Sequence, residues 1–171
     1  MKFPEAWETW VDGGHRSVVE YEGGQRFPKG SIMANETAGK YKILVVDDDA
    51  DILSTMVMAL EELGQTILTA GDGQQALDAI EAEKPDIVVL DIMLPKRGGF
   101  LILQKIKGKR EMKGKRPLVC MVTGTGGHRH QQFSEQLGVD DYLAKPFPLD
   151  NLVETVRGFI EALDAGIEDA R

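Results

Sequence analysis

The sequence predicts a doubly wound α/β fold, a (βα)₅ three-layer sandwich built on a five-stranded parallel sheet. From residue 41 onward, short apolar runs alternate with stretches whose apolar residues have helical spacing. Three of the runs are nearly continuous rather than alternating, which is typical of strands covered by helices on both faces. Right-handed connections between parallel strands then place helices on the two sides of the sheet.

Five apolar runs are predicted to be the strands. The first of them ends in ILVV (43–46), which is expected to form the central strand of the sheet. In chain order the runs are YKILVV (41–46), QTILTA (65–70), PDIVVL (85–90), PLVCMV (117–122) and DDYLA (140–144).

The segments between the runs are predicted to be helices, because their apolar residues recur at helical spacing and so fall on one face. The first helix is expected to stop at Gly64, since glycine readily adopts the conformation that ends a helix. The apolar positions are Ile52, Leu53, Met56, Val57 and Leu60; Ala76, Leu77 and Ile80; Leu101, Leu103 and Ile106; Phe133 and Leu137; and Leu152, Val153, Val156, Phe159, Ile160 and Leu163.

Composition indicates a cytoplasmic protein with one main domain. The chain has 171 residues, 42% hydrophobic residues and a formal net charge of −8. This charge disfavours nonspecific nucleic-acid binding, and no apolar run is long enough to span a membrane. Cys120 is the single cysteine. It excludes an internal disulfide, suits a reducing compartment and is expected to be buried and inert.

The chain divides into an N-terminal extension (1–40), the α/β domain (41–164) and a short tail (165–171). The extension shows no pattern of the main fold, and residues 17–27 allow either a flexible tail or a small hairpin around a glycine pair. A natural start at Met33 is a further hypothesis, because the fold pattern begins downstream of it.

Polar residues follow four of the predicted strands: Asp47 and Asp48 the first, Asp91 the third, Thr123 the fourth and Lys145 the fifth. Carboxyl ends of parallel strands meet at one edge of a sheet, where ligands bind. Three carboxylates there need a counter-ion, and oxygen ligands suit Mg²⁺. Without metal, repulsion should raise the pKa of at least one carboxylate. A lysine and a hydroxyl on the opposite side would suit a phosphoryl group.

Residues 41–164 resemble the receiver domain of two-component response regulators, which has a flavodoxin-like fold. Four motifs in the expected order carry the resemblance. They are VVDDD (45–49), PDIVVLDIMLP (85–95), MVTG (121–124) and GVDDYLAKPF (138–147).

The resemblance implies a role for each acidic residue of the site. Asp91 would be the phosphoacceptor. Asp47 and Asp48 would hold Mg²⁺, for which Mn²⁺ can substitute, with Asp48 as a direct ligand and Asp47 acting through water. The backbone carbonyl of Met93 would supply a further oxygen.

The resemblance also implies how a phosphoryl group is held and sensed. Thr123 would bond a phosphoryl oxygen, and Lys145 would form an ion pair with the group. Tyr142 would be an aromatic switch that turns inward when Thr123 moves, the alternative being a packed core aromatic. The Lys145–Pro146 peptide would be cis, as in this family.

Several other polar residues are assigned to structure rather than to the site. Asp49 and Asp51 are expected to be the N-cap and a first-turn acid of the first helix. His128 and His130 lie in a glycine-rich loop sequence and are expected to be solvated, with a metal site as the less favoured alternative. The basic segment 105–116 is interpreted as a solvated helix end and loop, against binding to an acidic partner or RNA.

The resemblance implies a protein that takes a phosphoryl group from a histidine kinase or phosphotransfer protein. Neither residues 1–40 nor the short end contains a DNA-binding pattern, so a single-domain receiver without a DNA-binding domain is expected. Its output would be binding to a downstream protein, through the fourth helix, fifth strand and fifth helix, or onward transfer in a phosphorelay. The protein would be a monomer or a phosphorylation-dependent dimer.

Two other classes are weighed. A phosphorylation-independent binding module often lacks part of the acidic cluster or the lysine, whereas this chain has both. An Mg²⁺-dependent aspartyl phosphohydrolase typically has a second acid two residues after its nucleophile. That position here is Met93, which argues against the hydrolase.

Overall fold

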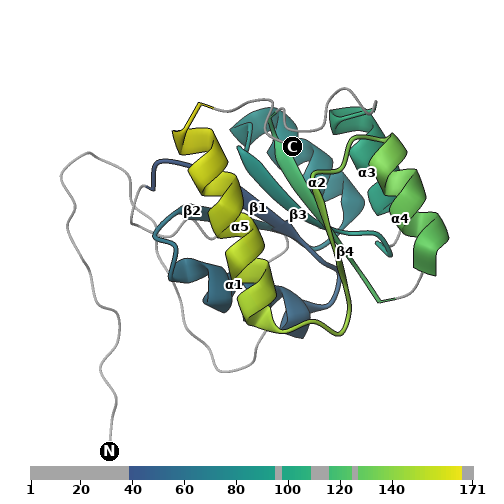
Figure 1. Ribbon diagram of the computed structural model, residues 1–171, viewed down its shortest axis with the longest axis horizontal. Coiled ribbons are helices and arrows are strands. Elements are labelled where there is room, and N and C mark those ends of the chain that lie inside the picture. Colours follow the sequence, from purple (N-terminus) through teal and green to yellow (C-terminus); the bar gives the residue numbers. More distant parts are fainter. Residues whose placement is uncertain (1–38, 95–97, 109–115, 125–126, 167–171) are drawn as a thin grey trace, which may run out of the picture.

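The computed structural model describes residues 39–94, 98–108, 116–124 and 127–166 (Figure 1). The expected hairpin or tail at 17–27 and the possible start at Met33 lie outside these residues. Strand and helix alternate five times along the described chain. The elements are β1 (Lys42–Val46), α1 (Ala50–Glu61), β2 (Thr66–Ala70), α2 (Gly73–Glu83), β3 (Ile87–Asp91), α3 (Gly99–Ile106), β4 (Leu118–Thr123), α4 (Gly127–Gln136), β5 (Asp141–Ala144) and α5 (Leu149–Asp164).

The five strands form one parallel sheet in the order β2-β1-β3-β4-β5. The predicted (βα)₅ fold is therefore confirmed, but the expectation that residues 43–46 form the central strand is wrong. β3 lies in the centre, and β1 lies between β2 and β3. All residues of β3 and β4 are buried, whereas the edge strands β2 and β5 are partly exposed.

Two apolar cores lie on opposite faces of the sheet, because successive strand residues point in opposite directions. One core joins the sheet to α2, α3 and the residues that follow α4, and the other joins it to α1 and α5. Figure 1 shows α1 and α5 together on one side of the strands. From the strands, the first core takes Leu44, Val46, Val88, Leu90, Val119 and Met121, and the second takes Ile43, Val45, Ile87, Val89, Cys120 and Val122.

Short loops at the carboxyl edge carry the predicted site residues. The loop after β1 leads directly into α1, whose N-cap is Asp49: its carboxylate accepts hydrogen bonds from the backbone N–H groups of Asp51 and Ile52. The predicted roles of Asp49 and Asp51 are therefore confirmed. Gly64 has a φ of +63° just beyond the end of α1, in agreement with its predicted role.

The loop between β3 and α3 leads to Gly99, where any larger residue would force the neighbouring backbone to move. A Cβ atom on Gly99 would lie 2.1 Å from the backbone oxygen of Asp91. The Gly99 N–H also donates to the Ile92 carbonyl at 3.0 Å. Gly99 thus lets α3 begin in direct contact with the end of β3, where the predicted phosphoacceptor lies.

Candidate functional site

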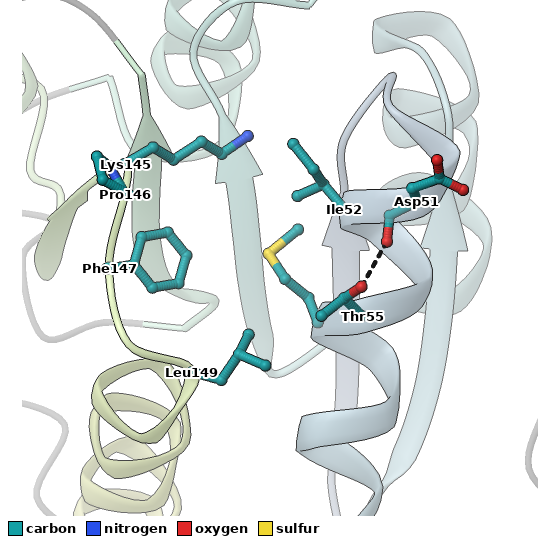
Figure 2. Close-up of a pocket in the computed structure, with 8 residues that line it drawn as sticks. Asp51, Ile52, Thr55, Lys145, Pro146, Phe147 and Leu149 are labelled. Carbon is teal, nitrogen blue, oxygen red and sulfur yellow. Dashed lines mark hydrogen bonds between the residues drawn. The ribbon is translucent and has the colours of Figure 1, made fainter.

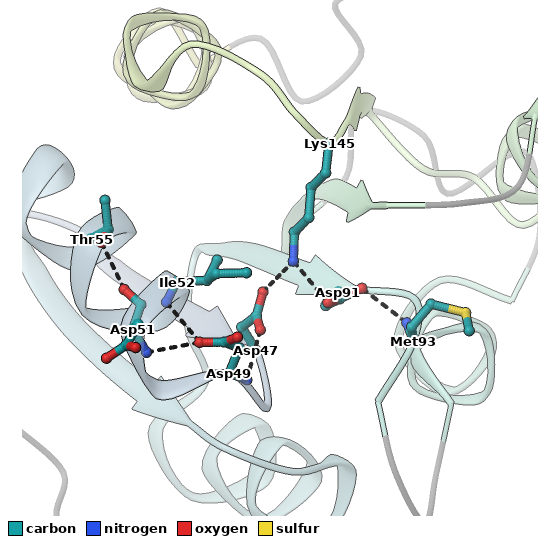
Figure 3. A network of polar contacts seen from close by, with 8 residues as sticks. All are labelled: Asp47, Asp49, Asp51, Ile52, Thr55, Asp91, Met93 and Lys145. Carbon is teal, nitrogen blue, oxygen red and sulfur yellow. Dashed lines mark hydrogen bonds and ion pairs between the residues drawn. The ribbon is translucent and has the colours of Figure 1, made fainter.

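Residues from three strand ends converge at the carboxyl edge of the sheet (Figure 3). The Lys145 Nζ atom lies 2.6 Å from Asp47 Oδ2 and 3.0 Å from Asp91 Oδ2. Asp47 and Asp91 are 1% and 6% exposed. Lys145 was expected to face the carboxylates from the opposite side. It lies between two of them instead, since buried carboxylates require a nearby positive charge.

Asp48 completes the acidic cluster. Carboxylate oxygens of Asp47, Asp48 and Asp91 all lie within 4.8 Å of one another, and Asp48 is exposed to solvent. Three carboxylates at this separation fit a hard divalent cation, which prefers oxygen ligands and keeps several waters when it is Mg²⁺. The exposed Asp48 is the most accessible of the three to a hydrated ion.

Backbone N–H groups orient the two buried carboxylates. The Met93 N–H donates to Asp91 Oδ1 at 2.9 Å, and the Asp49 N–H donates to Asp47 Oδ1 at 2.9 Å. Both contacts join an aspartate to the residue two positions on, the pattern of an Asx-turn. These donors were missed by the sequence reasoning. An aspartate placed directly after a strand is the signal that could have identified them.

Burial and charge act in opposite directions on Asp47. Burial raises the pKa of its carboxyl group above the usual value, although hydrogen bonds from Lys145 and from the Asp49 N–H oppose the shift. Repulsion from Asp91 is a smaller contribution. A raised carboxylate pKa was expected from repulsion. The direction is confirmed, but the main cause is loss of water.

Lys145 shows the complementary effect. Burial alone lowers the pKa of its ammonium group, but hydrogen bonds to Asp47 and Asp91 outweigh burial and leave the pKa raised. The lysine is therefore firmly cationic at neutral pH. The Lys145–Pro146 peptide bond is cis, as the resemblance implied.

Thr123 and Tyr142 lie next to each other on β4 and β5. Thr123 ends β4 and is 2% exposed, and its carbonyl accepts a hydrogen bond from the Lys145 N–H at 2.6 Å. Tyr142 is half-buried against the core on the face of the sheet that α2 and α3 cover. Its pKa is raised by burial, against a hydrogen bond with the Thr123 side chain. The ring is thus turned inward, toward the hydroxyl that the sequence placed at the site.

A pocket of about 550 Å³ opens beside Lys145, between α1 and the loop that follows β5 (Figure 2). Its wall is mostly apolar, with Asp51 and Thr55 at one side. Lys145 lines the pocket and also contacts the carboxylates, so the pocket and the acidic site share one residue. The apolar lining residues are Ile52, Met56, Pro146, Phe147 and Leu149.

The remaining sequence predictions concern residues outside the cluster. Cys120 is fully buried, as expected, and burial raises the pKa of its thiol well above the usual value. The side chains of His128 and His130, and residues 109–115 of the basic segment, lie outside the part of the chain that the structure describes. At the described start of that segment, the prediction of a solvated helix end is wrong for Lys107, which is 5% exposed. Within the described residues, no helix has the length and apolar character required to cross a bilayer.

Comparison with known proteins identifies relatives of the described domain. Residues 43–157 match the family described as "Response regulator receiver domain". The PhoP protein of Bacillus subtilis, an alkaline phosphatase synthesis transcriptional regulatory protein, is 41% identical over 106 residues, or 62% of this chain and 42% of the relative. A probable transcriptional regulator, ycf27 of Guillardia theta, is 36% identical over 121 residues, or 71% of this chain and 46% of the relative. The chain thus matches less than half the length of these relatives.

Solved structures agree with the fold. A CheY-like response regulator receiver domain protein from Methanospirillum hungatei has a TM-score of 0.65 and 31% identity, covering 74% of this chain and 98% of that one. The beryllofluoride-activated receiver domain of DrrB, a protein of Thermotoga maritima, has a TM-score of 0.62 and 34% identity. That match covers 71% of this chain and 97% of the other.

Proposed function

Because the chain belongs to the response regulator receiver family, we propose that it is a signalling phosphoacceptor that takes a phosphoryl group on Asp91. The donor is a histidine kinase or a phosphotransfer protein. The observation that carries this proposal is the position of the Asp91 carboxylate, 3.0 Å from Lys145 Nζ and within 4.8 Å of Asp47 and Asp48. We place the receiver domain at residues 41–164, flanked by 1–40 and 165–171.

The transfer step is a displacement at phosphorus. An Asp91 carboxylate oxygen attacks the phosphorus of phosphohistidine, the P–N bond breaks, and the leaving imidazole takes up a proton. Lys145 offsets the repulsion between the carboxylate and the incoming anion, and it stabilises charge on the transferred group. The Met93 N–H fixes one oxygen of Asp91, so the nucleophile is positioned before the donor arrives.

Mg²⁺ is the proposed cofactor, and Mn²⁺ can substitute. Asp48 and Asp91 would bind it, with Asp47 acting through water and the Met93 carbonyl as a further ligand. When bound, the ion neutralises charge on the phosphoryl oxygens. The Thr123 hydroxyl would form a hydrogen bond with a phosphoryl oxygen. Tyr142, which lies against Thr123, would then change its position and alter the face of α4, β5 and α5.

We propose that the protein donor docks at the pocket beside Lys145. Its apolar wall suits an apolar face of the donor, and the shared Lys145 places that face next to Asp91. Leu149, which lines the pocket and is 37% exposed, offers a test. Leu149→Asp is expected to slow transfer from a protein donor more than uptake from acetyl phosphate. Equal slowing of both would contradict docking at this pocket.

Output is proposed to occur through altered protein binding or onward phosphotransfer, in the cytoplasm and as a monomer or phosphorylation-dependent dimer. The matched relatives are described as transcriptional regulators, and this chain corresponds to less than half of their length. The hydrolase alternative remains disfavoured: Met93 occupies the position of the second acid, and its side chain is 58% exposed.

The deciding experiment uses acetyl phosphate with Mg²⁺ and intact-mass spectrometry. The wild-type protein should gain one phosphoryl group, and Asp91→Asn should gain none. Asp78→Asn is the matched control, because Asp78 is an exposed aspartate on α2 outside the site. EDTA should abolish uptake. No uptake by the wild-type protein from acetyl phosphate or from a range of histidine kinases would overturn the proposal.

A further inference from the structure

A lysine and an aspartate form a buried ion pair away from the acidic cluster. Lys107 follows directly after α3, and its Nζ atom lies 2.8 Å from Asp140 Oδ2. The two side chains are 0% and 6% exposed. Burial lowers the pKa of Lys107, and Asp140 opposes that shift. Two charges held this far from water are costly, and each is tolerated because the other is present.

Asp140 also fastens the start of β5 to β4. Its Oδ2 atom accepts a hydrogen bond from the Val119 N–H at 2.6 Å, and its own N–H donates to the Val119 carbonyl at 3.0 Å. β5 has four residues, lies at the edge of the sheet and is partly exposed. A short edge strand has few other contacts to fix its register, and a slip of one residue would turn each side chain to the opposite face.

The register of β5 decides where two site residues lie. Tyr142 pairs with Met121, and Ala144 pairs with Thr123, which brings Lys145 directly past the end of β4. The helix that precedes Lys107 also reaches the site at its other end: α3 begins at Gly99, against the Asp91 carbonyl, and Lys107 caps its C-terminal end. α3 therefore links the end of β3, which carries Asp91, with the start of the strand that leads to Lys145.

We propose that Lys107 is a positioning residue for phosphoryl transfer. By neutralising Asp140 inside the protein, it holds β5 in the register that places Lys145 between Asp47 and Asp91. This inference rests on the proposed function, since its effect on activity is measured as phosphoryl uptake. Lys107 itself lies outside the reacting groups and acts through Asp140, β5 and Lys145.

The test compares Lys107→Met, Asp140→Asn, the double variant and Lys107→Arg in the full chain. Uptake from acetyl phosphate with Mg²⁺ is measured together with hydrogen exchange at the Lys145 amide, which bonds the Thr123 carbonyl. Lys107→Met should slow uptake about tenfold and speed exchange at that amide, because a small displacement of a positioned group is costly. Lys107→Arg, which keeps the charge, should restore both.

Lys42→Met is the matched control. Lys42 pairs with Glu83 at 3.0 Å on a partly exposed surface, so its loss removes an ion pair without leaving a buried charge. The Lys42→Met variant should take up phosphoryl groups at the wild-type rate. Wild-type uptake and exchange in Lys107→Met would overturn the inference, and so would equal slowing in Lys42→Met.

The double variant keeps the test decisive if Lys107→Met fails to fold. With both charges removed, the asparagine side chain that replaces Asp140 can still accept from the Val119 N–H, so the double variant should fold and approach wild-type uptake. A double variant no better than the poorer single variant would overturn the inference. If the wild-type protein takes up no phosphoryl group, the proposed function fails, while exchange at the Lys145 amide still decides the role of Lys107.

Discussion

The Asp47 carboxyl group combines a charge with almost complete burial, and this has a consequence for stability. Its pKa is raised in the folded protein, chiefly by burial. The folded state therefore holds the proton more tightly than the unfolded chain, whose aspartates titrate near pKa ~3.9. It follows that the free energy of unfolding decreases as pH rises from about 4 through the raised pKa.

Asp47→Asn should remove this pH dependence. In metal-free buffer, the stability of the variant relative to the wild-type protein should increase between pH 4 and pH 7, because the wild-type protein alone loses stability as the buried carboxyl group ionises. Urea unfolding at several pH values measures it. The exposed Asp78→Asn should follow the wild-type curve. An Asp47→Asn variant that loses stability with pH as steeply as the wild-type protein would contradict the assignment.

Gly99 controls the position of Asp91 through its missing side chain. In Gly99→Ala the new Cβ atom would meet the Asp91 backbone oxygen at 2.1 Å, so β3 and α3 must separate. The expected cost is about 1–3 kcal/mol of stability, as for other overpacked sites, together with slower phosphoryl uptake. Thermal unfolding and intact-mass kinetics measure the two effects.

Gly158→Ala is the matched control for that substitution. Gly158 lies inside α5, and a Cβ atom there would meet nothing within 4 Å. Because alanine favours a helix interior over glycine, this variant should be about 0.5–1 kcal/mol more stable than the wild-type protein. If Gly99→Ala behaved like Gly158→Ala, the close approach of α3 to β3 would be disproved.

At the scale of the elements, α4 is joined to α3 by an aromatic pair. Its sequence is mostly polar, and Phe133 is 47% exposed. The Phe133 ring packs edge-on against Phe100 of α3, with ring centroids 5.0 Å apart and an interplanar angle of 70°. This aromatic pair is thus a direct link between α3 and α4.

Phe133→Ala should loosen α4 without unfolding the sheet. An edge-to-face pair contributes about 0.5–1.5 kcal/mol beyond its buried area, so amides of α4 should exchange several-fold faster while those of β3 keep their protection. Hydrogen exchange followed residue by residue measures this. Leu101→Ala is the control, since Leu101 is 60% exposed on α3. Uniformly faster exchange across the sheet would contradict a local role.

At the scale of the whole molecule, the sequence predicts what depends on periodicity and on strand ends. Continuous apolar runs identify strands buried on both faces, and residues that follow such strands must gather at one edge. The gathering of Asp47, Asp91 and Lys145 could therefore be expected. Thr123 and Tyr142 are likewise adjacent, although their roles stay predictions.

The sequence does not reveal the order of the strands in the sheet or the places where two backbone segments come into contact. Nothing in a run of apolar residues states which neighbours flank it, which is why β1 was wrongly placed in the centre. The Gly98–Gly99 pair gave no sign that Gly99 touches the Asp91 backbone. The buried pair of Lys107 and Asp140 was likewise unpredictable, because it joins residues 33 positions apart (140 − 107) through tertiary packing.

Because negative charge gathers at the carboxyl edge, we expect the stability of the whole domain to depend on divalent metal. A cation that binds the folded state and not the unfolded chain stabilises it in proportion to the logarithm of its concentration. At a Mg²⁺ concentration about 100 times its dissociation constant, the gain is about 2.7 kcal/mol, or a rise of roughly 10 °C in Tm.

Asp48→Asn should lose most of this rise, because Asp48 is the exposed member of the carboxylate cluster, whereas Asp78→Asn should keep it. Thermal unfolding with increasing MgCl₂, against NaCl at matched ionic strength, measures the effect; an equal rise with NaCl, or an undiminished rise in Asp48→Asn, would show that Mg²⁺ acts by general screening rather than at this site.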